Sequence, residues 1–197
     1  MPAPPRRAVL LLLVALSCRA DDPQPRCPAP FAADPARASA LVARLRSHPE
    51  GAQVLASVPS SQAPLICFGP AAPSSITTEG VILLDRELDE PEAAARVGHL
   101  LEHAAKEMPT TGDCDAQVSA MLGREARALA LELRLRRELG VRAPRIPYAF
   151  EDAFWAAPPQ QREGLLLEYL RAHPDGAPGL DALASSYARR CRETKER

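Results

Sequence analysis

Aromatic side chains are scarce in this chain, with one Trp, three Tyr and four Phe among 197 residues. Strands favour aromatic and β-branched residues, whereas Ala, Leu and Arg favour helices, so this scarcity predicts a mostly helical fold. An excess of charge of either sign is also lacking, since the formal net charge is −1. Without a charged surface to attract nucleic acid, we expect no nucleic-acid partner.

Several motifs of catalysis are missing as well. No Ser lies in a G-x-S-x-G elbow, no Gly-rich loop is suited to cradle a phosphate, and no C-x-x-C pair is present. These absences argue against serine-hydrolase, nucleotide-binding and thioredoxin-like functions.

The N-terminal residues 1–18 predict an export leader. A positively charged start precedes an apolar run, residues 8–16, which is too short to span a bilayer. Two ways of processing remain open. The segment VALSC (14–18) resembles a bacterial lipobox, which would make Cys18 the acylated first residue and its lipid the membrane contact; alternatively, cleavage follows Ala20. We therefore expect a protein of the bacterial cell envelope, either lipid-anchored or else periplasmic or secreted.

Four cysteines remain besides Cys18, and an even number favours disulfides in an oxidising compartment. Four cysteines allow three pairings. We favour Cys67–Cys114, which would tie the first strand to the loop before a long helix. Cys27–Cys191 would then join the two ends of the chain.

The chain after the leader reads as a Pro-rich tether (19–34) and a single domain (35–197). Helices are expected wherever apolar residues recur at helical spacing between capping residues, and strands in β-branched runs bounded by Pro or Gly. The expected helices are 36–47, 52–57, one that starts at residue 89 or 90, 115–139, 151–173 with a break near Pro158, and 180–196. The expected strands are 64–69 and 76–84. This order predicts an α+β, mostly helical fold, in which a small antiparallel hairpin or three-stranded sheet packs against a helix pair with flanking helices.

Two of the four histidines, His99 and His103, lie one turn apart on the helix that starts at residue 89 or 90. Positions i and i+4 of an α-helix share a face, so two imidazoles could hold one metal ion. A helical projection places both on the polar face, opposite the stripe that includes Val97 and Leu101. The helix alone therefore predicts two solvated histidines.

Glu125 interrupts the apolar stripe of the 115–139 helix. A buried carboxylate is costly without a partner, so Glu125 must meet a metal, a hydrogen-bond donor or a cation such as Arg96. Glu132 lies near the same face, but it has a local partner in Arg136, four residues further on.

The order of strand, helix with His-x-x-x-His, loop and helix with Glu resembles the core of the Glu-zincin metallopeptidases, over residues 76–139. The resemblance implies zinc as the cofactor, with His99, His103 and Glu125 as its ligands. In that family the residue after the first His is the Glu of H-E-x-x-H, the general base. Here that residue is Leu100, which cannot take a proton, so the resemblance implies a degenerate zincin.

The same residues also spell H-x-x-E-H, the pattern of inverted zincins, in which Glu102 would be the general base. Three functions thus stay open. The first is an exported, lipid-anchored, non-catalytic protein with a zincin-like scaffold that could bind a metal. The second is an active zinc peptidase with Glu102 as base, and the third is a metal-free helical envelope protein. We expect the first, because without a base the enzyme loses proton transfer worth about 10²–10⁴-fold in rate.

Overall fold

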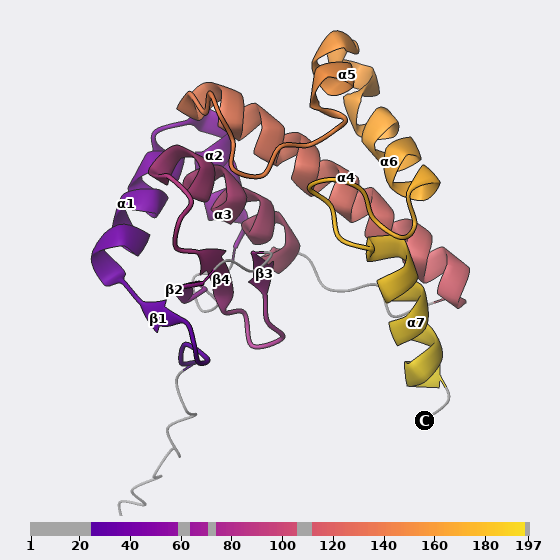
Figure 1. The fold of residues 1–197 in the computed structure, drawn as a ribbon, viewed down its shortest axis with the longest axis horizontal. Coiled ribbons are helices and arrows are strands. Elements are labelled where there is room, and N and C mark those ends of the chain that lie inside the picture. Colours follow the sequence, from indigo (N-terminus) through magenta and orange to yellow (C-terminus); the bar gives the residue numbers. More distant parts are fainter. Residues whose placement is uncertain (1–24, 59–63, 71–73, 106–111, 196–197) are drawn as a thin grey trace, which may run out of the picture.

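The sheet of this protein holds four strands in the order β1-β2-β4-β3 (Figure 1). The computed structural model describes residues 25–58, 64–70, 74–105 and 112–195. The central strands pair in parallel and are largely buried, whereas each short edge strand pairs antiparallel with its neighbour. The strands are β1 (Ala32–Ala33), β2 (Ile66–Gly69), β3 (Ser75–Ile76) and β4 (Ile82–Asp85).

Helices make up most of the rest of the described chain. Local signals set the ends of the two helices that matter most here: Asp89 and Asp113 cap the N-termini of α3 and α4 with their carboxylates, and Gly140 ends α4 with a φ of 78°. The helices are α1 (Pro35–Arg46), α2 (Pro49–Ser57), α3 (Glu90–Ala104), α4 (Cys114–Leu139), α5 (Glu151–Ala156), α6 (Arg162–Ala172) and α7 (Leu183–Lys195), with a 3-10 turn at Pro159–Gln161.

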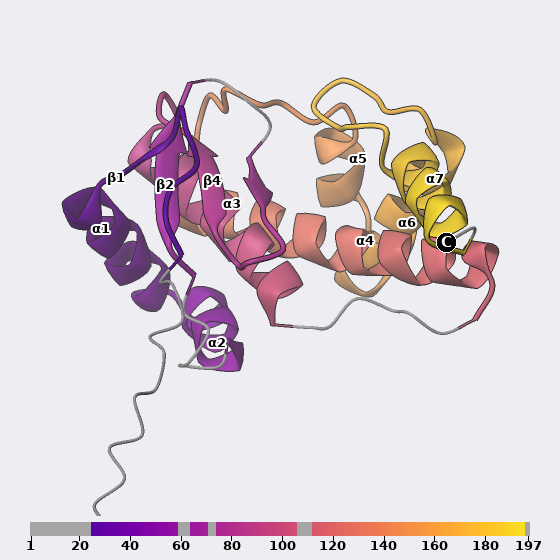
Figure 2. The same cartoon turned by 90° about the horizontal axis from the view of Figure 1, so that it is seen from below.

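The long helix α4 crosses the molecule, with the sheet and α1–α3 towards one end and α5–α7 towards the other (Figures 1 and 2). Two hydrophobic clusters follow this division. The first lies between the sheet and α1–α3 and includes Leu45 and Ile82, and the second includes Phe154 and Leu166. Helix α4 contributes residues to both clusters, so it is the element that joins the two parts.

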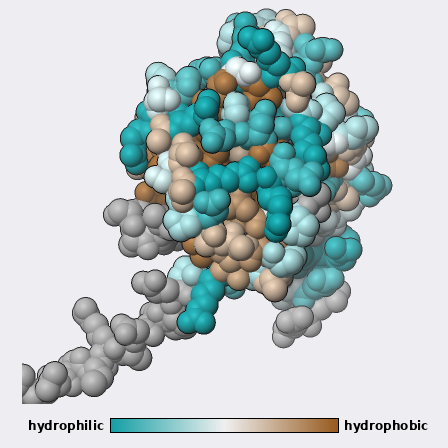
Figure 3. Space-filling model, turned by 60° about the vertical axis from the view of Figure 1, so that its left-hand side comes forward, coloured by the Kyte–Doolittle hydropathy of each residue, from teal (hydrophilic) through white to brown (hydrophobic). Residues whose placement is uncertain are grey.

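Hydrophilic side chains cover much of the face on the α1 side of the molecule, with hydrophobic ones between and below them (Figure 3). Helix α1 explains part of this surface, because it buries Leu41 and Leu45 and exposes Arg46 to solvent. Such an amphipathic helix covers a core without needing a partner outside the chain.

The predicted fold class, α+β and mostly helical, is confirmed. The sheet differs from the prediction in its pairing. Residues 76–84 are not one strand but the hairpin β3–β4, which turns at residues 77–80 with Gly80 at a φ of 78°. Because β3 turns back on β4, β4 runs in the same direction as β2, and the central pair is parallel.

Both predicted disulfide pairings are wrong, although all four cysteines are bonded. The bonds join Cys27 to Cys67 and Cys114 to Cys191. Strand β1 pairs with β2, which brings Cys27 beside Cys67. The N-terminus of α4 packs against α7, which brings Cys114 to Cys191. Each bond therefore follows a tertiary contact that the spacing of the cysteines does not reveal.

The described end of the segment predicted as a tether, residues 25–34, is attached to the domain by β1 and by the Cys27 disulfide. The predicted leader (1–18) and Cys18 lie outside the described residues. Among the helices that the structure describes, none combines the length and the apolar character needed to cross a membrane.

Candidate metal centre

The polar face of α3 is buried against α4, so the prediction of two solvated histidines is wrong. The side chain of His99 is 3% exposed, and His103 is half-buried. The reason lies on the neighbouring helix, where Glu125 and Glu132 stand two turns apart and face α3. The face of α3 that its own sequence marks as polar therefore contacts carboxylates of α4 and not water.

These facing side chains form what we call the polar layer. From α3 it takes positions spaced three or four residues apart, and α4 supplies carboxylates and one guanidinium. Its members are Glu92, Arg96, His99, His103, Glu125, Glu132 and Arg136. Since the layer lies between the two helices, every member that it buries has to be neutralised within it.

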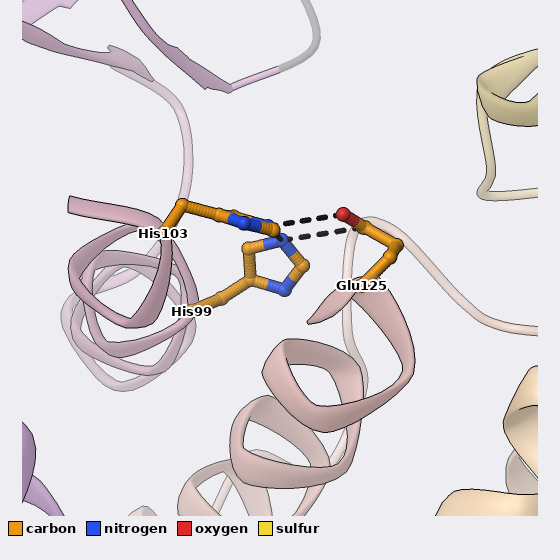
Figure 4. Close-up of side chains that lie close together, drawn as sticks. All are labelled: His99, His103 and Glu125. Atoms are coloured by element: carbon orange, nitrogen blue, oxygen red, sulfur yellow. Dashed lines mark hydrogen bonds and ion pairs between the residues drawn. The ribbon is translucent and has the colours of Figure 1, made fainter. Parts of the chain in front are cut away.

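His99, His103 and Glu125 converge at one end of this layer (Figure 4), and we call them the His-His-Glu cluster. The Nε2 atoms of the two histidines are 3.2 Å apart. Glu125 Oε1 lies 3.4 Å from His99 Nε2, and Glu125 Oε2 lies 3.0 Å from His103 Nε2. Three donor atoms thus surround one point, two on α3 and the third on α4.

The donor atoms of the cluster lie close enough together to share one metal ion. Ligand atoms roughly 2.0–2.1 Å from a zinc ion at tetrahedral angles are about 3.3 Å from one another. The two imidazole nitrogens, 3.2 Å apart, match that value, and each has a different oxygen of Glu125 within 3.4 Å. The donor set of two imidazole nitrogens and a carboxylate is also one that zinc uses in proteins.

Glu132 stands behind His99, on the side away from the cluster. Its Oε2 is 3.0 Å from His99 Nδ1, although the two atoms are not aligned as a hydrogen bond. A carboxylate at Nδ1 favours the tautomer that leaves Nε2 free to bind a metal. The other contacts of Glu132 are hydrogen bonds that it accepts from Arg96 (3.0 Å), Arg136 (2.6 Å) and Tyr148 (3.1 Å to each oxygen).

Burial and charge shift the pKa values of the cluster in opposite directions. Burial opposes ionisation of His99, but the carboxylates of Glu125 and Glu132 outweigh it and raise the pKa of His99. Burial alone would raise the pKa of Glu125, yet the two histidines hold it well below its usual range. The pKa of Glu132 is also lowered against burial, chiefly by Arg96 and Arg136. Both carboxylates therefore stay ionised at neutral pH.

A cleft of about 1120 Å³ includes all three side chains of the cluster in its wall. Residues 74–80, from the β3–β4 hairpin, line one side, and residues 179–190, from the start of α7 and the loop before it, line another. The cluster is thus open to a ligand from solvent, unlike a structural site that is closed by protein on every side.

The structure brings together the three predicted metal ligands and leaves Glu102 apart from them. The carboxylate of Glu102 lies 4.0 Å from Arg127 Nε, and Glu102 is not among the residues that line the cleft. Leu100, which replaces the base of the zincin pattern, is buried and does line the cleft.

Glu132 is the residue of this centre that the sequence analysis missed. Arg136 was identified as its partner, and that pair is present at 2.6 Å. Its contacts with Arg96, His99 and Tyr148 come from other elements. One signal could have found it: Glu132 is seven residues after Glu125, hence on the same helical face, so both carboxylates had to meet the same neighbour. Arg96, one of the alternative partners that the sequence offers for Glu125, binds Glu132.

Searches against protein-family models, curated proteins and solved structures find no match to this chain.

Proposed function

We propose that this chain is an exported metal-binding protein whose three-ligand site, open to a cleft, holds zinc and has no peptidase activity. The observation that carries the proposal is the convergence of His99 Nε2, His103 Nε2 and the Glu125 carboxylate: the nitrogens are 3.2 Å apart, as two zinc ligands would be, and each has a carboxylate oxygen within 3.4 Å. Glu132 supports the proposal because its carboxylate lies 3.0 Å from His99 Nδ1, the ring nitrogen that faces away from the cluster.

Three protein ligands leave a four-coordinate zinc ion with one further position, which is the arrangement of reactive or ligand-binding zinc sites. The cleft supplies access to that position. When bound, zinc would act as a Lewis acid towards an oxygen of the ligand. The protein side chains would hold the ion, orient His99 and provide the walls against which a ligand packs.

The absence of peptidase activity rests on the position of the acidic groups. A zinc peptidase needs a general base within hydrogen-bond reach of the reacting group. Leu100 cannot act as one, and the contact of Glu102 with Arg127 is on a part of α3 outside the cleft lining. The resemblance to the zincins therefore extends to the metal ligands and not to the base.

Export is supported by the two disulfides, which are stable in an oxidising compartment. The predicted leader and lipobox point the same way and would place the chain in a bacterial envelope, attached through a lipid at Cys18. Labelling cells with a radioactive fatty acid tests this part of the proposal, because Cys18→Ser should abolish the label on the protein.

The metal site is tested by purifying the protein without a His tag or added metal and measuring its zinc content by mass spectrometry. We expect about one zinc ion per chain in the wild type. His99→Ala should contain none. His173→Ala is the matched control, because His173 is exposed at the end of α6 and should leave the zinc content unchanged. A wild-type protein that takes up no stoichiometric zinc, even when zinc is added, would reduce the cluster to buried ion pairs.

The proposed lack of catalysis has its own test. The zinc-loaded protein is incubated with a peptide library, and we expect no hydrolysis above that of His99→Ala. Cleavage that depends on zinc and disappears in Glu102→Gln would instead make Glu102 the base and the protein a peptidase.

A further inference from the structure

The walls of the cleft carry charge and apolar surface in separate places, which points to the kind of ligand that it accepts. Three cationic side chains, Arg96, Arg124 and Arg190, line the cleft together with Tyr187, and Arg96 is already paired with Glu132. Tyr187 and Arg190 belong to α7, whereas Arg124 lies on α4, directly before the proposed ligand Glu125.

Tyr187 is placed to donate a hydrogen bond to whatever lies beside the cluster. Its ring contacts the guanidinium of Arg190, whose Cζ is 5.0 Å from the ring centroid. Tyr187 lines the same cleft as the cluster, and burial and the negative charge of Glu125 raise the pKa of its phenol. A phenol that keeps its proton at every physiological pH is a donor to an anion and cannot become a competing anion itself.

Arg124 adds a fixed positive charge next to the cluster. It is 7% exposed, and its Nη2 donates a 3.0 Å hydrogen bond to the carbonyl oxygen of His103. The acidic groups of the cleft other than Glu125 are Glu79 and Asp181, and both are exposed at its rim. Glu79, Asp181 and Arg190 are all exposed, so water screens their charges more strongly than that of the buried Arg124, and the interior of the cleft beside a bound metal ion favours an anion.

Apolar side chains from the helices form another part of the wall, while the β3–β4 hairpin adds serines and threonines. The apolar part comes from α3, α4, the segment before α5, the loop before α7 and the start of α7, and it includes Leu100, Met121, Leu129, Ile146, Leu180 and Leu183. Apolar surface next to a few polar groups is the usual composition of a small-molecule site, in which the polar groups fix orientation and the apolar wall supplies affinity.

We propose that the cleft binds small organic carboxylates with an apolar group, the carboxylate lying between the metal site and Tyr187 with Arg124 and Arg190 beside it. The apolar group packs on the leucine-rich wall. This inference rests on the proposed metal-binding function and names the ligand class for the same site.

The test uses the full-length, disulfide-bonded protein loaded with zinc, whose content is measured first in every variant. Binding of 4-phenylbutyrate is measured by isothermal titration calorimetry. Two comparison compounds separate the two parts of the proposal: 4-phenylbutyramide lacks the charge, and acetate lacks the apolar group. We expect the amide to bind at least about tenfold more weakly, since charge-assisted hydrogen bonds are the strong ones. Acetate should also bind about tenfold more weakly or worse.

Two variants in α7 test the residues. Arg190→Gln and Tyr187→Phe should each weaken binding of 4-phenylbutyrate roughly three- to tenfold without loss of zinc. Arg189→Gln is the matched control: Arg189 is the neighbouring exposed arginine, lies outside the cleft lining and faces Glu193 at 4.0 Å. Its affinity for the carboxylate should be that of the wild type.

The outcomes separate this inference from the function on which it rests. If the wild-type protein takes up no zinc, the proposed function fails and this inference fails with it. If zinc binds but the carboxylate and its amide bind equally, or neither binds, only the ligand class is overturned. Equal effects of the Arg190 and Arg189 substitutions, together with wild-type affinity in Tyr187→Phe, would overturn it too.

Discussion

Glu132 is fully buried, and its carboxylate balances two guanidinium groups, those of Arg96 and Arg136. Glu132→Gln keeps the shape of the side chain but leaves two buried cations with less compensation. We expect the free energy of unfolding of the metal-free protein to fall by about 3–5 kcal/mol, as for a broken buried ion pair. Urea denaturation followed by circular dichroism measures it.

A matched control for this prediction is Glu138→Gln. Glu138 also lies on α4, but it is half-exposed and its nearest charged partner is His48 at 3.7 Å. The free energy of unfolding should change by no more than about 0.5 kcal/mol. Equal losses in the two variants would contradict the central position given to Glu132 in the polar layer.

The shifted pKa values of the cluster predict how zinc stabilisation depends on pH. The pKa of His99 is raised above 6.5, so in the metal-free protein its contribution to stability is complete below pH 6.5 and is lost as pH rises through the raised pKa. The pKa of Glu125 is lowered from 4.5, so its contribution is complete above pH 4.5 and is lost only as pH falls through the lowered pKa. The cluster therefore stabilises the metal-free protein most between pH 4.5 and 6.5.

Stabilisation by added zinc should increase as pH rises above 6.5, whereas the contribution of the metal-free cluster decreases. The reason is that zinc binds only neutral imidazole and would compete with the proton on His99. The rise in melting temperature on adding zinc should thus be larger at about pH 8 than at about pH 6. Differential scanning fluorimetry of the wild type measures it, with His99→Ala as the control in which zinc has no effect at either pH. A zinc effect that is independent of pH would contradict the raised pKa of His99.

At the scale of elements, the close approach of α3 and α4 depends on Gly98. A Cβ at this position would collide with the end of the Leu135 side chain on α4, and this fully buried side chain would have to shift within the core. Gly98→Ala should therefore lower the free energy of unfolding by about 1–3 kcal/mol, the usual cost of overpacking a core. The change is measured by chemical denaturation and is opposite in sign to the intrinsic helix preference for Ala.

Gly164 in α6 is the control for Gly98, because a Cβ there meets open space. Gly164→Ala should stabilise the protein by about 0.5–1 kcal/mol through helix propensity alone. If both substitutions stabilise the protein, α3 and α4 are not in close contact at Gly98.

Helix boundaries could be predicted from the sequence because the signals that set them are local. Asp89 and Asp113 bond to backbone groups three residues away, and Gly140 supplies the left-handed turn that ends α4. The pairing of β2 with β4 could not be predicted in this way. Their parallel arrangement depends on where the turn at Gly80 places β3, and nothing within either strand specifies it.

The candidate site shows the same limit. His99, His103 and Glu125 could be chosen because helical spacing and an acid in an apolar stripe are visible in the sequence. Their burial could not, because the polar face of α3 is covered by another helix. The sequence of α3 therefore predicts solvent where the structure has Glu132. The sequence of one helix shows which of its faces is polar. Whether that face meets water or protein depends on the helix that packs against it.

At the scale of the whole molecule, the Cys114–Cys191 disulfide fastens α7 to the start of α4. Replacing both cysteines by Ser should lower the free energy of unfolding by roughly 2–5 kcal/mol. Because α7 carries Tyr187 and Arg190, the affinity for 4-phenylbutyrate should fall as well. The zinc content should stay at its wild-type level, since none of the predicted ligands lies on α7.

The Cys27–Cys67 disulfide provides the comparison, since it joins the N-terminal segment to β2, away from α7. Its removal should destabilise the protein but weaken binding of 4-phenylbutyrate less than removal of the other bond, because Pro25 lines the cleft and neither Tyr187 nor Arg190 lies on the segment that it holds. It encloses 40 residues of chain against 77 for the other bond, so its contribution to stability should be smaller by about 0.6 kcal/mol. Equal losses of ligand affinity in both variants would show that α7 is not held in place by its own disulfide.

The sharing of α4 between two hydrophobic clusters has a consequence for how the native protein opens. Leu135 packs with the sheet and α1–α3, and Leu133 with α5–α7, so either group of elements can detach while α4 stays folded on the other. The amide hydrogens in the middle of α4 should then exchange with solvent deuterium only on complete unfolding. Those of α1 and α6 should exchange sooner, through two separate partial openings. In the proposed zinc-bound protein, the ion would bridge α3 to α4 and slow exchange on the sheet side alone.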